Sequence, residues 1–174
     1  RLVRRARVKL PLIARKANAI ITPSDTVKNQ VCVHLGITAD KLFAIPEAAR
    51  RSFYRASPAE TAAVRERLGV ETDFVLFVGT VEPRKNVLNL VRAYEELVRG
   101  DLSPVQLVIA GERGWLLNDL NTYLASSPIK QRVLFTGHLS DDELRALYSS
   151  CKVFAYPSLY EGFGLPLLEA MACG

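Results

Sequence analysis

One stretch of the chain decides the fold: residues 74–99 read FVLFVGTVEPRKNVLNLVRAYEELVR. Its first five residues are all apolar, which is typical of a strand that is buried on both faces. After the loop at 79–86, apolar residues recur at helical spacing from Val87 to Arg99 and predict an amphipathic helix. A doubly buried strand followed directly by a helix is the repeating unit of a parallel α/β sheet.

The same alternation continues on both sides of this stretch. Apolar runs at 105–110, 132–135 and 152–156 predict three further strands, and each is followed by a helical pattern, at about 115–125, at 140–149 and from 165 onward. We therefore predict an α/β fold, with a Rossmann-like, doubly wound parallel sheet.

Shorter elements precede this sheet. Ser57, Pro58 and Glu60 form the signature of a capping box with proline in the first turn, and predict a helix that ends near Gly69. Further upstream, strands at 19–22 and 42–45 flank a helix at about 25–35.

Composition excludes several classes of protein. The chain has 174 residues, of which 49% are hydrophobic and 24% charged, as in globular domains rather than disordered ones. No apolar run approaches the roughly 20 residues that span a bilayer. The three cysteines lie far apart and only two histidines are present, which argues against a disulfide framework or a multi-histidine metal centre. We expect reduced thiols and a cytoplasmic location.

The net charge of +5 comes from the N-terminal segment. Residues 1–24 hold seven basic side chains and no acidic one, whereas acids outnumber bases in the rest of the chain. Apolar residues recur at helical spacing from Leu2 to Ala17, and Pro11 is expected to kink or break this helix. The segment is either an ordinary solvated helix face or a basic amphipathic face for an anionic membrane or a nucleic acid.

The loop at 79–86 is a candidate phosphate site. Because the carboxyl ends of parallel strands carry the ligand sites of such sheets, the loops after the strands are the places to search. Gly79 permits a sharp turn, and Arg84 and Lys85 stand at the start of a helix, where cations are poorly placed for helix stability. They could bind phosphate or form a solvated surface pair.

The loop at 157–164 and the helix after it carry the most specific pattern. Gly162 and Gly164 can present successive backbone N–H groups to an anion at a helix N-terminus. Glu161 and Glu169 stand eight residues apart, and Glu169 lies in an apolar helix, where a carboxylate needs hydrogen-bond donors. Two adjacent sugar hydroxyls would supply them; a structural turn with a capping glutamate is the alternative.

Glu161 through Glu169 resembles the E-x7-E signature of the retaining glycosyltransferases of family 4, which have the GT-B fold. The resemblance extends to the loop from Val78 to Asn86, and to the segments 108–111, 114–116 and 135–140. It implies one half of a GT-B fold. Residues 1–55 would then be the tail of an N-terminal acceptor-side domain with a linker, and residues 56–174 an incomplete nucleotide-sugar-binding domain.

The resemblance also implies a role for each matching residue. Lys85 and Arg84 would neutralise the diphosphate of the donor, and Glu161 would bind sugar hydroxyls near the reacting carbon, so these three are the expected catalytic residues. Glu169 would bind the ribose hydroxyls. The other expected donor contacts are Gly79 beside the phosphates, His138 and Leu139 beside the base, and the backbone amides of Gly162, Phe163, Gly164 and Leu165.

These expectations define a function. The chain resembles the donor-binding part of a hexosyltransferase of the mannosyltransferase-like branch, which would use GDP-mannose without a metal or other cofactor in polysaccharide biosynthesis. The acceptor would be a carbohydrate or a lipid-linked sugar, with a peripheral contact at the inner face of the membrane and no nucleic-acid partner.

Two other functions are considered from the sequence. A non-catalytic module that uses the basic N-terminal helix is the alternative function, and a nicotinamide-dependent oxidoreductase is disfavoured because no GxGxxG follows any predicted strand. The chain begins with Arg1 and stops at Gly174 as a helix closes, so we expect a piece of a longer protein that binds nucleotide with little or no turnover.

Overall fold

The computed structural model describes residues 2–99, 105–115 and 118–174, with side chains from residue 8 onward. Its contacts divide the chain into two compact units: Arg1–Ala48 with Gly162–Gly164, and Ala49–Glu161 with Leu165–Gly174. The division falls before the predicted boundary at residues 55 and 56. Phe53 and Ala56 are buried with the second unit, and the Ala56 N–H donates to Ser149 Oγ at 2.9 Å.

The smaller unit contains two short parallel strands and two helices. β1 (Ile20–Thr22) pairs with β2 (Leu42–Ala44), and the helices are α1 (Leu2–Lys16) and α2 (Asp25–Leu35), with a 3-10 turn, η1, at Ala39–Lys41. Of the two outcomes expected at Pro11, a kink or a break, the break is excluded, because α1 continues through this residue. Proline removes one backbone hydrogen bond, and beyond it Ala14 is buried in the core of this unit, which keeps the last turn in place.

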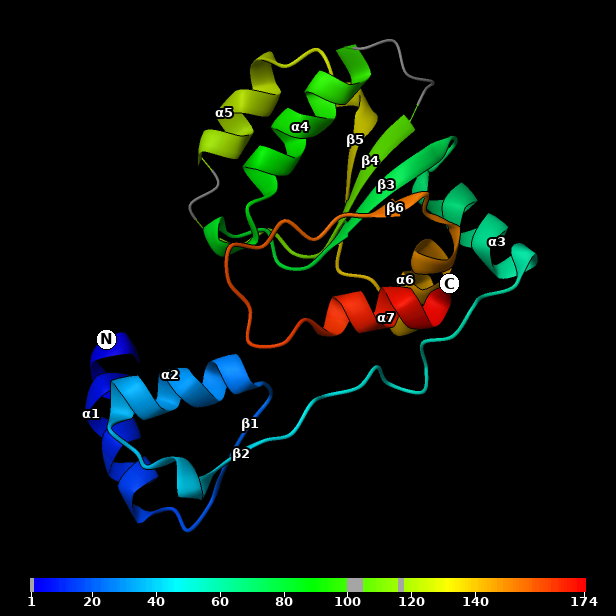
Figure 1. The fold of residues 1–174 in the computed structure, drawn as a ribbon. Helices are drawn as coiled ribbons and strands as arrows, with labels where there is room; N and C mark the ends of the chain where they lie inside the picture. The colour runs from blue at the N-terminus through cyan, green and yellow to red at the C-terminus, as the bar shows by residue number, and fades with distance from the viewer. Residues whose placement is uncertain (1, 100–104, 116–117) are drawn as a thin grey trace. The chain divides into compact units, whose positions relative to one another are not determined.

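The larger unit is an α/β sheet, shown in Figure 1. Its strands are β3 (Asp73–Val78), β4 (Val105–Ala110), β5 (Val133–Gly137) and β6 (Val153–Phe154), and its helices are α3 (Pro58–Leu68), α4 (Val87–Arg99), α5 (Asn118–Ser126), α6 (Asp141–Ser150) and α7 (Leu165–Cys173). Two 3-10 turns, η2 (Pro83–Lys85) and η3 (Lys130–Arg132), complete it. The strands lie in the order β5-β4-β3-β6 and are all parallel, which confirms the predicted α/β class.

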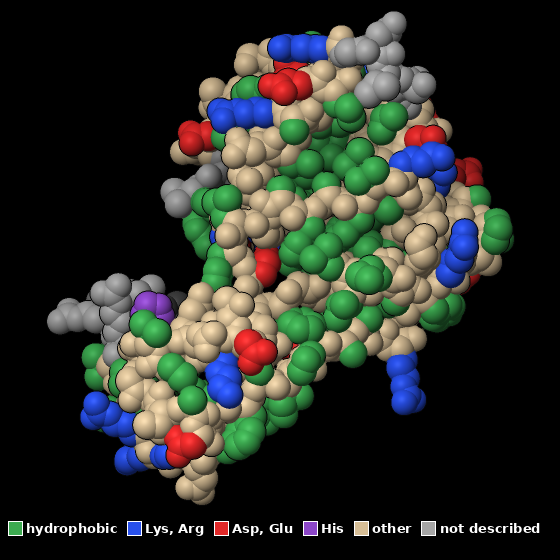
Figure 2. Space-filling view, viewed as in Figure 1, with side chains coloured by type: hydrophobic (Ala, Val, Ile, Leu, Met, Phe, Trp, Pro, Cys, Tyr) green, Lys and Arg blue, Asp and Glu red, His purple; other side chains and the backbone are tan. Residues whose placement is uncertain are grey.

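Helices cover both faces of this sheet because the side chains of a strand alternate between its faces. Phe74, Leu76 and Val78 of β3 pack in one cluster with residues of α3, α6 and α7. Val75 and Phe77 face the other way and pack with residues of α4 and α5. Figure 2 shows hydrophobic side chains gathered over the sheet of this unit. Two separate cores on one sheet are the physical form of the predicted doubly wound arrangement.

Local sequence signals define the helix ends. The capping box predicted at Ser57 is confirmed, and Ser140 forms a second one with Glu143. The strand predicted at 152–156 is shorter, since only Val153–Phe154 are in the sheet, at its edge. α5 is described from Asn118, and residues 116–117, on which the expected start near residue 115 depends, lie outside the described part of the chain.

Glycines at the carboxyl ends of the strands allow the backbones of neighbouring loops to approach closely. The Gly79 N–H donates to the Ala110 carbonyl and the Gly111 N–H to the Gly137 carbonyl, each at 2.9 Å. Gly111 has φ +140°, and a Cβ there would lie 2.3 Å from the Gly79 carbonyl oxygen. A side chain at this position would push apart the loops that follow β3 and β4.

We expect Gly111→Ala to destabilise the fold far more than Gly69→Ala. Both glycines have positive φ, but a Cβ at Gly69 meets nothing within 4 Å, so only the backbone strain of about 1–2 kcal/mol applies there. Gly111→Ala adds the clash with Gly79, for a total of about 3 kcal/mol or more. Urea unfolding of both variants measures the difference. Equal losses of unfolding free energy would show that the clash is relieved without cost.

Candidate functional site

The loops that follow three neighbouring strands enclose a pocket of about 440 Å³ in the larger unit. It lies at the carboxyl ends of β3, β4 and β5, where open α/β sheets hold their ligands. Three residues predicted from the sequence line it: Gly79, the exposed His138 and the buried Leu139. The other lining residues are Val78, Thr80, Ala110, Gly111, Glu112 and Leu144.

The three residues expected to be catalytic lie together in the same unit. Lys85 Nζ donates to Glu161 Oε1 at 2.6 Å, and Arg84 Nη1 donates to Glu161 Oε2 at 2.6 Å. Lys85 is buried, and its side chain would lie within 4 Å of a Cβ placed on Gly79. The structure therefore brings together a buried cation, a second cation and a carboxylate, next to a glycine that borders the pocket.

Backbone contacts fix the two loops that carry these side chains. The Leu159 N–H donates to the Arg84 carbonyl at 2.9 Å, Arg84 Nη1 donates to the Tyr160 carbonyl at 2.8 Å, and Asn86 Nδ2 donates to the Pro157 carbonyl at 3.2 Å. Asn86 ends the turn η2 with φ 58°, a left-handed conformation that asparagine adopts more readily than most residues. The loop after β3 is thus attached to the loop after its neighbour β6.

Sequence analysis missed a second carboxylate in this cluster. Glu82 is buried, and its Oε1 accepts hydrogen bonds from Arg84 Nε at 3.1 Å and Nη2 at 2.7 Å. Its place in the same loop, two residues before Arg84, was the available signal. Tyr156 was also missed; its ring centre lies 5.4 Å from Lys85 Nζ, a cation–π contact.

Electrostatics keep this cluster charged. Burial alone would raise the pKa of Glu161, but hydrogen bonds from neighbours that include Lys85 and Arg84 outweigh it and lower the pKa to about 2. Burial, and next the charge of Glu161, raises the pKa of Tyr156 to about 12. Glu161 is consequently an anion, and Tyr156 a neutral phenol, throughout the physiological range.

The second glutamate of the pattern lies on α7. Glu169 is buried, with 8% of its surface exposed, and its Oε2 accepts a hydrogen bond from the Tyr148 hydroxyl at 3.2 Å. Leu165, also predicted, is the first residue of that helix. Gly162, Phe163 and Gly164 fall in the smaller unit by their contacts, so their predicted role toward the donor stays a prediction.

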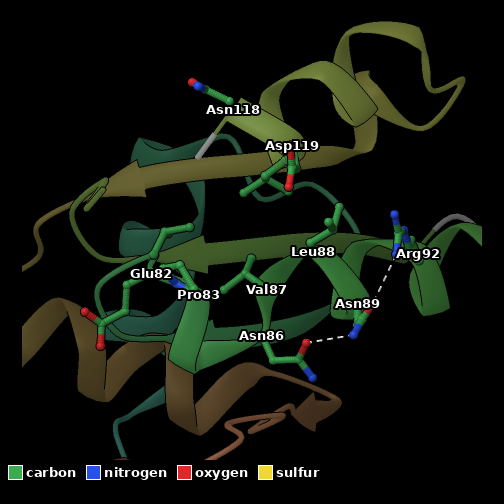
Figure 3. Close-up of a pocket in the computed structure, with 11 residues that line it drawn as sticks. Glu82, Pro83, Asn86, Val87, Leu88, Asn89, Arg92, Asn118 and Asp119 are labelled. Carbon is green, nitrogen blue, oxygen red and sulfur yellow. Dashed lines mark hydrogen bonds between the residues drawn. The ribbon is translucent and has the colours of Figure 1, made fainter. Parts of the chain in front are cut away.

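Another pocket, of about 540 Å³, lies on the α4 side of the larger unit (Figure 3). Polar and charged side chains border it, among them Glu82, Asn86, Asn89, Arg92 and Asp119. Sequence analysis gave no signal for it, because its residues come from α4, α5 and the loop before α4.

The described residues provide neither a metal-binding cluster nor a membrane-spanning helix. In the described ranges, His, Cys, Asp and Glu side chains form no group of three or more that could hold a metal ion. Among the helices described, none is both long enough and apolar enough to cross a membrane.

A parallel α/β sheet with a pocket at the ends of its strands places the larger unit in the class of open α/β domains, which hold their ligands at that edge of the sheet. Within that class, residues 60–174 match the family described as glycosyl transferases group 1. The chain belongs to this family, which confirms the resemblance to glycosyltransferases inferred from the sequence.

Individual relatives agree with this assignment. The chain is 33% identical over 159 residues to O-antigen chain mannosyltransferase B of Escherichia coli, covering 91% of this chain and 42% of that protein. It is 34% identical over 164 residues to the serotype-specific mannosyltransferase WbdA of E. coli, covering 91% of this chain and 20% of that protein. The chain thus spans less than half the length of these relatives.

The fold matches solved GT-B glycosyltransferases. The crystal structure of Anabaena Alr3699/HepE in complex with UDP and glucose superposes with a TM-score of 0.80 and 25% identity, covering 96% of this chain and 45% of that one.

Acid should reduce the stabilising effect of Glu161. Because its pKa in the fold is lower than its ordinary value of 4.5, its contribution to the unfolding free energy is complete above pH 4.5 and is lost as pH falls toward about 2. We expect Glu161→Gln to be less stable than wild type at pH 7, and the gap to narrow between pH 4.5 and 2. Urea unfolding across this range measures it.

Glu96→Gln is the matched control, since Glu96 is an exposed carboxylate on α4. Surface substitutions of this kind usually change stability by less than about 0.5 kcal/mol. A gap for Glu161→Gln that stays constant with pH would contradict the lowered pKa.

Proposed function

We propose that this chain is the donor-binding part of a retaining glycosyltransferase that transfers mannose from GDP-mannose to a carbohydrate or lipid-linked acceptor. One observation carries the proposal: Arg84, Lys85 and Glu161 meet at the carboxyl ends of neighbouring strands, beside a pocket bordered by Gly79. The family membership of the chain agrees with it.

The two cations suit a diphosphate. Lysine carries three N–H donors and arginine five, so each can donate to phosphate oxygens. The closeness of the Lys85 side chain to Gly79 places one positive charge at the edge of the pocket. A diphosphate at this edge would leave the base on the side of His138 and Leu139.

The mannosyltransferase relatives favour mannose as the transferred sugar. The choice of base is less constrained, since the structural neighbour HepE was solved with UDP and glucose. GDP is therefore the proposed nucleotide, and UDP is the competitor that the binding experiment has to include.

In the proposed reaction, the bond from the anomeric carbon to the diphosphate breaks as the acceptor hydroxyl attacks the same face of the sugar. The leaving diphosphate takes the acceptor proton. Lys85 and Arg84 would stabilise the charge that develops on the leaving group, a large contribution in many enzymes, so that no metal ion is required. Glu161 would hold sugar hydroxyls near the reacting carbon.

The acceptor-side function belongs to a longer protein in this proposal. This chain by itself is expected to bind nucleotide and to release little or no GDP from GDP-mannose, in keeping with the share of its relatives that it spans.

The exposed side chains of α1 favour a second candidate function, a peripheral contact with an anionic membrane. Val8, Leu10, Leu12 and Ile13 are each at least half exposed, and Lys9, Arg15 and Lys16 are exposed beside them. Helices that combine exposed apolar and basic side chains lie in the plane of the membrane interface.

Calorimetric titration with GDP, UDP and guanosine tests the donor site. We expect GDP to bind more tightly than UDP and guanosine. Lys85→Met should weaken GDP binding by on the order of tenfold, since a hydrogen bond to a charged group is lost, while leaving guanosine binding unchanged. Equal binding with Mg²⁺ and with EDTA is the expected result for a metal-independent site.

Lys152→Met is the matched control, because Lys152 is an exposed lysine that pairs with Asp73 at the opposite end of β3. It should leave GDP binding unaltered. If Lys85→Met and Lys152→Met bind GDP equally well, Lys85 does not contact the diphosphate.

Flotation with vesicles tests the membrane contact. We expect binding to vesicles that contain phosphatidylglycerol and not to pure phosphatidylcholine, and loss of binding when Lys9, Arg15 and Lys16 are all replaced by Glu, at about 1 kcal/mol per basic residue removed. Absence of flotation with either lipid would remove this function, and duplex DNA is expected not to bind.

A further inference from the structure

The carboxylate of Glu169 is held by a tyrosine from another helix. Tyr148 lies on α6, is only 3% exposed, and donates its hydroxyl to Glu169 Oε2 at 3.2 Å. Its ring is fixed by edge-on contacts with Phe53 and Phe154, at centroid distances of 5.9 and 5.2 Å. Burial, and next the charge of Glu169, raises the pKa of Tyr148 well above its usual value, so the hydroxyl keeps its proton.

Arg50 contacts the other oxygen more loosely. Its Nη2 lies 3.7 Å from Glu169 Oε1, and its side chain is 61% exposed and also pairs with Asp141 at 2.7 Å. A separation of 3.7 Å is longer than a hydrogen bond. Tyr148 is therefore the group that fixes the orientation of the carboxylate.

This arrangement leaves acceptor capacity on Glu169. A carboxylate has about four lone-pair sites, and the hydrogen bond from Tyr148 uses one of them on Oε2. A carboxylate held at one oxygen by a rigid donor can accept from two adjacent hydroxyls without first losing rotational freedom.

Packing alone does not explain the tyrosine. A phenylalanine would make the same ring contacts with Phe53 and Phe154, without a hydroxyl that needs a partner once it is removed from water. The hydroxyl instead serves Glu169, its partner in the fold.

We propose that Tyr148 is a positioning residue for ribose recognition: it orients the Glu169 carboxylate toward the vicinal hydroxyls of the bound nucleotide. This inference rests on the proposed function, together with the ribose contact that the resemblance in the sequence implies for Glu169.

Deoxynucleotides isolate this contact. GDP and 2′-deoxy-GDP are titrated calorimetrically into wild type, Tyr148→Phe, Glu169→Gln and the double variant. We expect wild type to prefer GDP by roughly tenfold, the size of a hydrogen bond to a charged group. Tyr148→Phe should reduce this preference to about threefold without changing the affinity for 2′-deoxy-GDP. In the Glu169→Gln background, the tyrosine substitution should have no further effect on the preference.

Tyr94→Phe is the matched control. Tyr94 is equally buried, in the core on the other face of the sheet, and donates its hydroxyl to the Val105 carbonyl. It should lower the melting temperature about as much as Tyr148→Phe, with no change in ribose preference.

The possible outcomes distinguish a failure of the positioning role of Tyr148 from a failure of the ribose contact of Glu169. If Tyr148→Phe weakens GDP and 2′-deoxy-GDP equally, or lowers the preference as much in the Glu169→Gln background, positioning is overturned and the donor site stands. If wild type shows no ribose preference, or Glu169→Gln leaves it intact, the ribose role of Glu169 fails and the positioning role fails with it.

Discussion

The candidate site depends on one ion pair, between the buried Lys85 and the partly exposed Glu161. The pair joins the loops that follow β3 and β6, which are neighbours in the sheet, and so fixes the edge of the sheet where the strand β6 is only two residues long. Buried ion pairs add little net stability, since apolar residues of similar volume often do as well, yet they become costly when one partner is removed. The pair therefore places two charged groups beside the pocket that Gly79 borders, where a ligand could contact them.

Much of the larger unit could be predicted because its signals are local. The start of α4 and the end of β4 agree with the sequence to the residue, since a buried strand and an amphipathic helix are both defined by their own side chains. The caps at Ser57 and Ser140 work in the same way, through contacts within four residues. The structure differs from these expectations where tertiary packing outweighs local preference: α1 runs through Pro11 because Ala14 is held in a core, and β6 is short because it pairs with β3 alone.

The candidate residues of the site could be selected from the sequence, but the contacts that they make with other side chains could not. Arg84, Lys85, Glu161 and Glu169 were visible because charged residues in strand-end loops or apolar helices are unusual. The side chains that contact Glu169 were not visible, because Tyr148 is an ordinary core aromatic in a helical pattern, and Arg50 belongs to a polar connection far along the chain. Only the packing of α6 against α7, and of residues 49–57 against the same unit, makes them neighbours of Glu169.

In the proposed function, the charge balance among Arg84, Lys85 and their carboxylate partners links recognition of the diphosphate to recognition of the sugar. Glu82 and Glu161 neutralise Arg84 and Lys85 in the structure, so the cluster carries no net charge to offer a diphosphate. A bound diphosphate must compete with these carboxylates for the two cations. Glu82 is buried and accepts two hydrogen bonds from Arg84. Glu161, in contrast, is partly exposed in the loop after β6 and pairs with both Arg84 and Lys85. Glu161 would therefore be the carboxylate that yields. Arg84 and Lys85 would donate to the phosphate instead, and the lone pairs that they leave on Glu161 would accept hydrogen bonds from the hydroxyls of the sugar. Recognition of the phosphate and of the sugar would then be coupled through Glu161. A sugar without a diphosphate would find the Glu161 carboxylate still paired with Lys85.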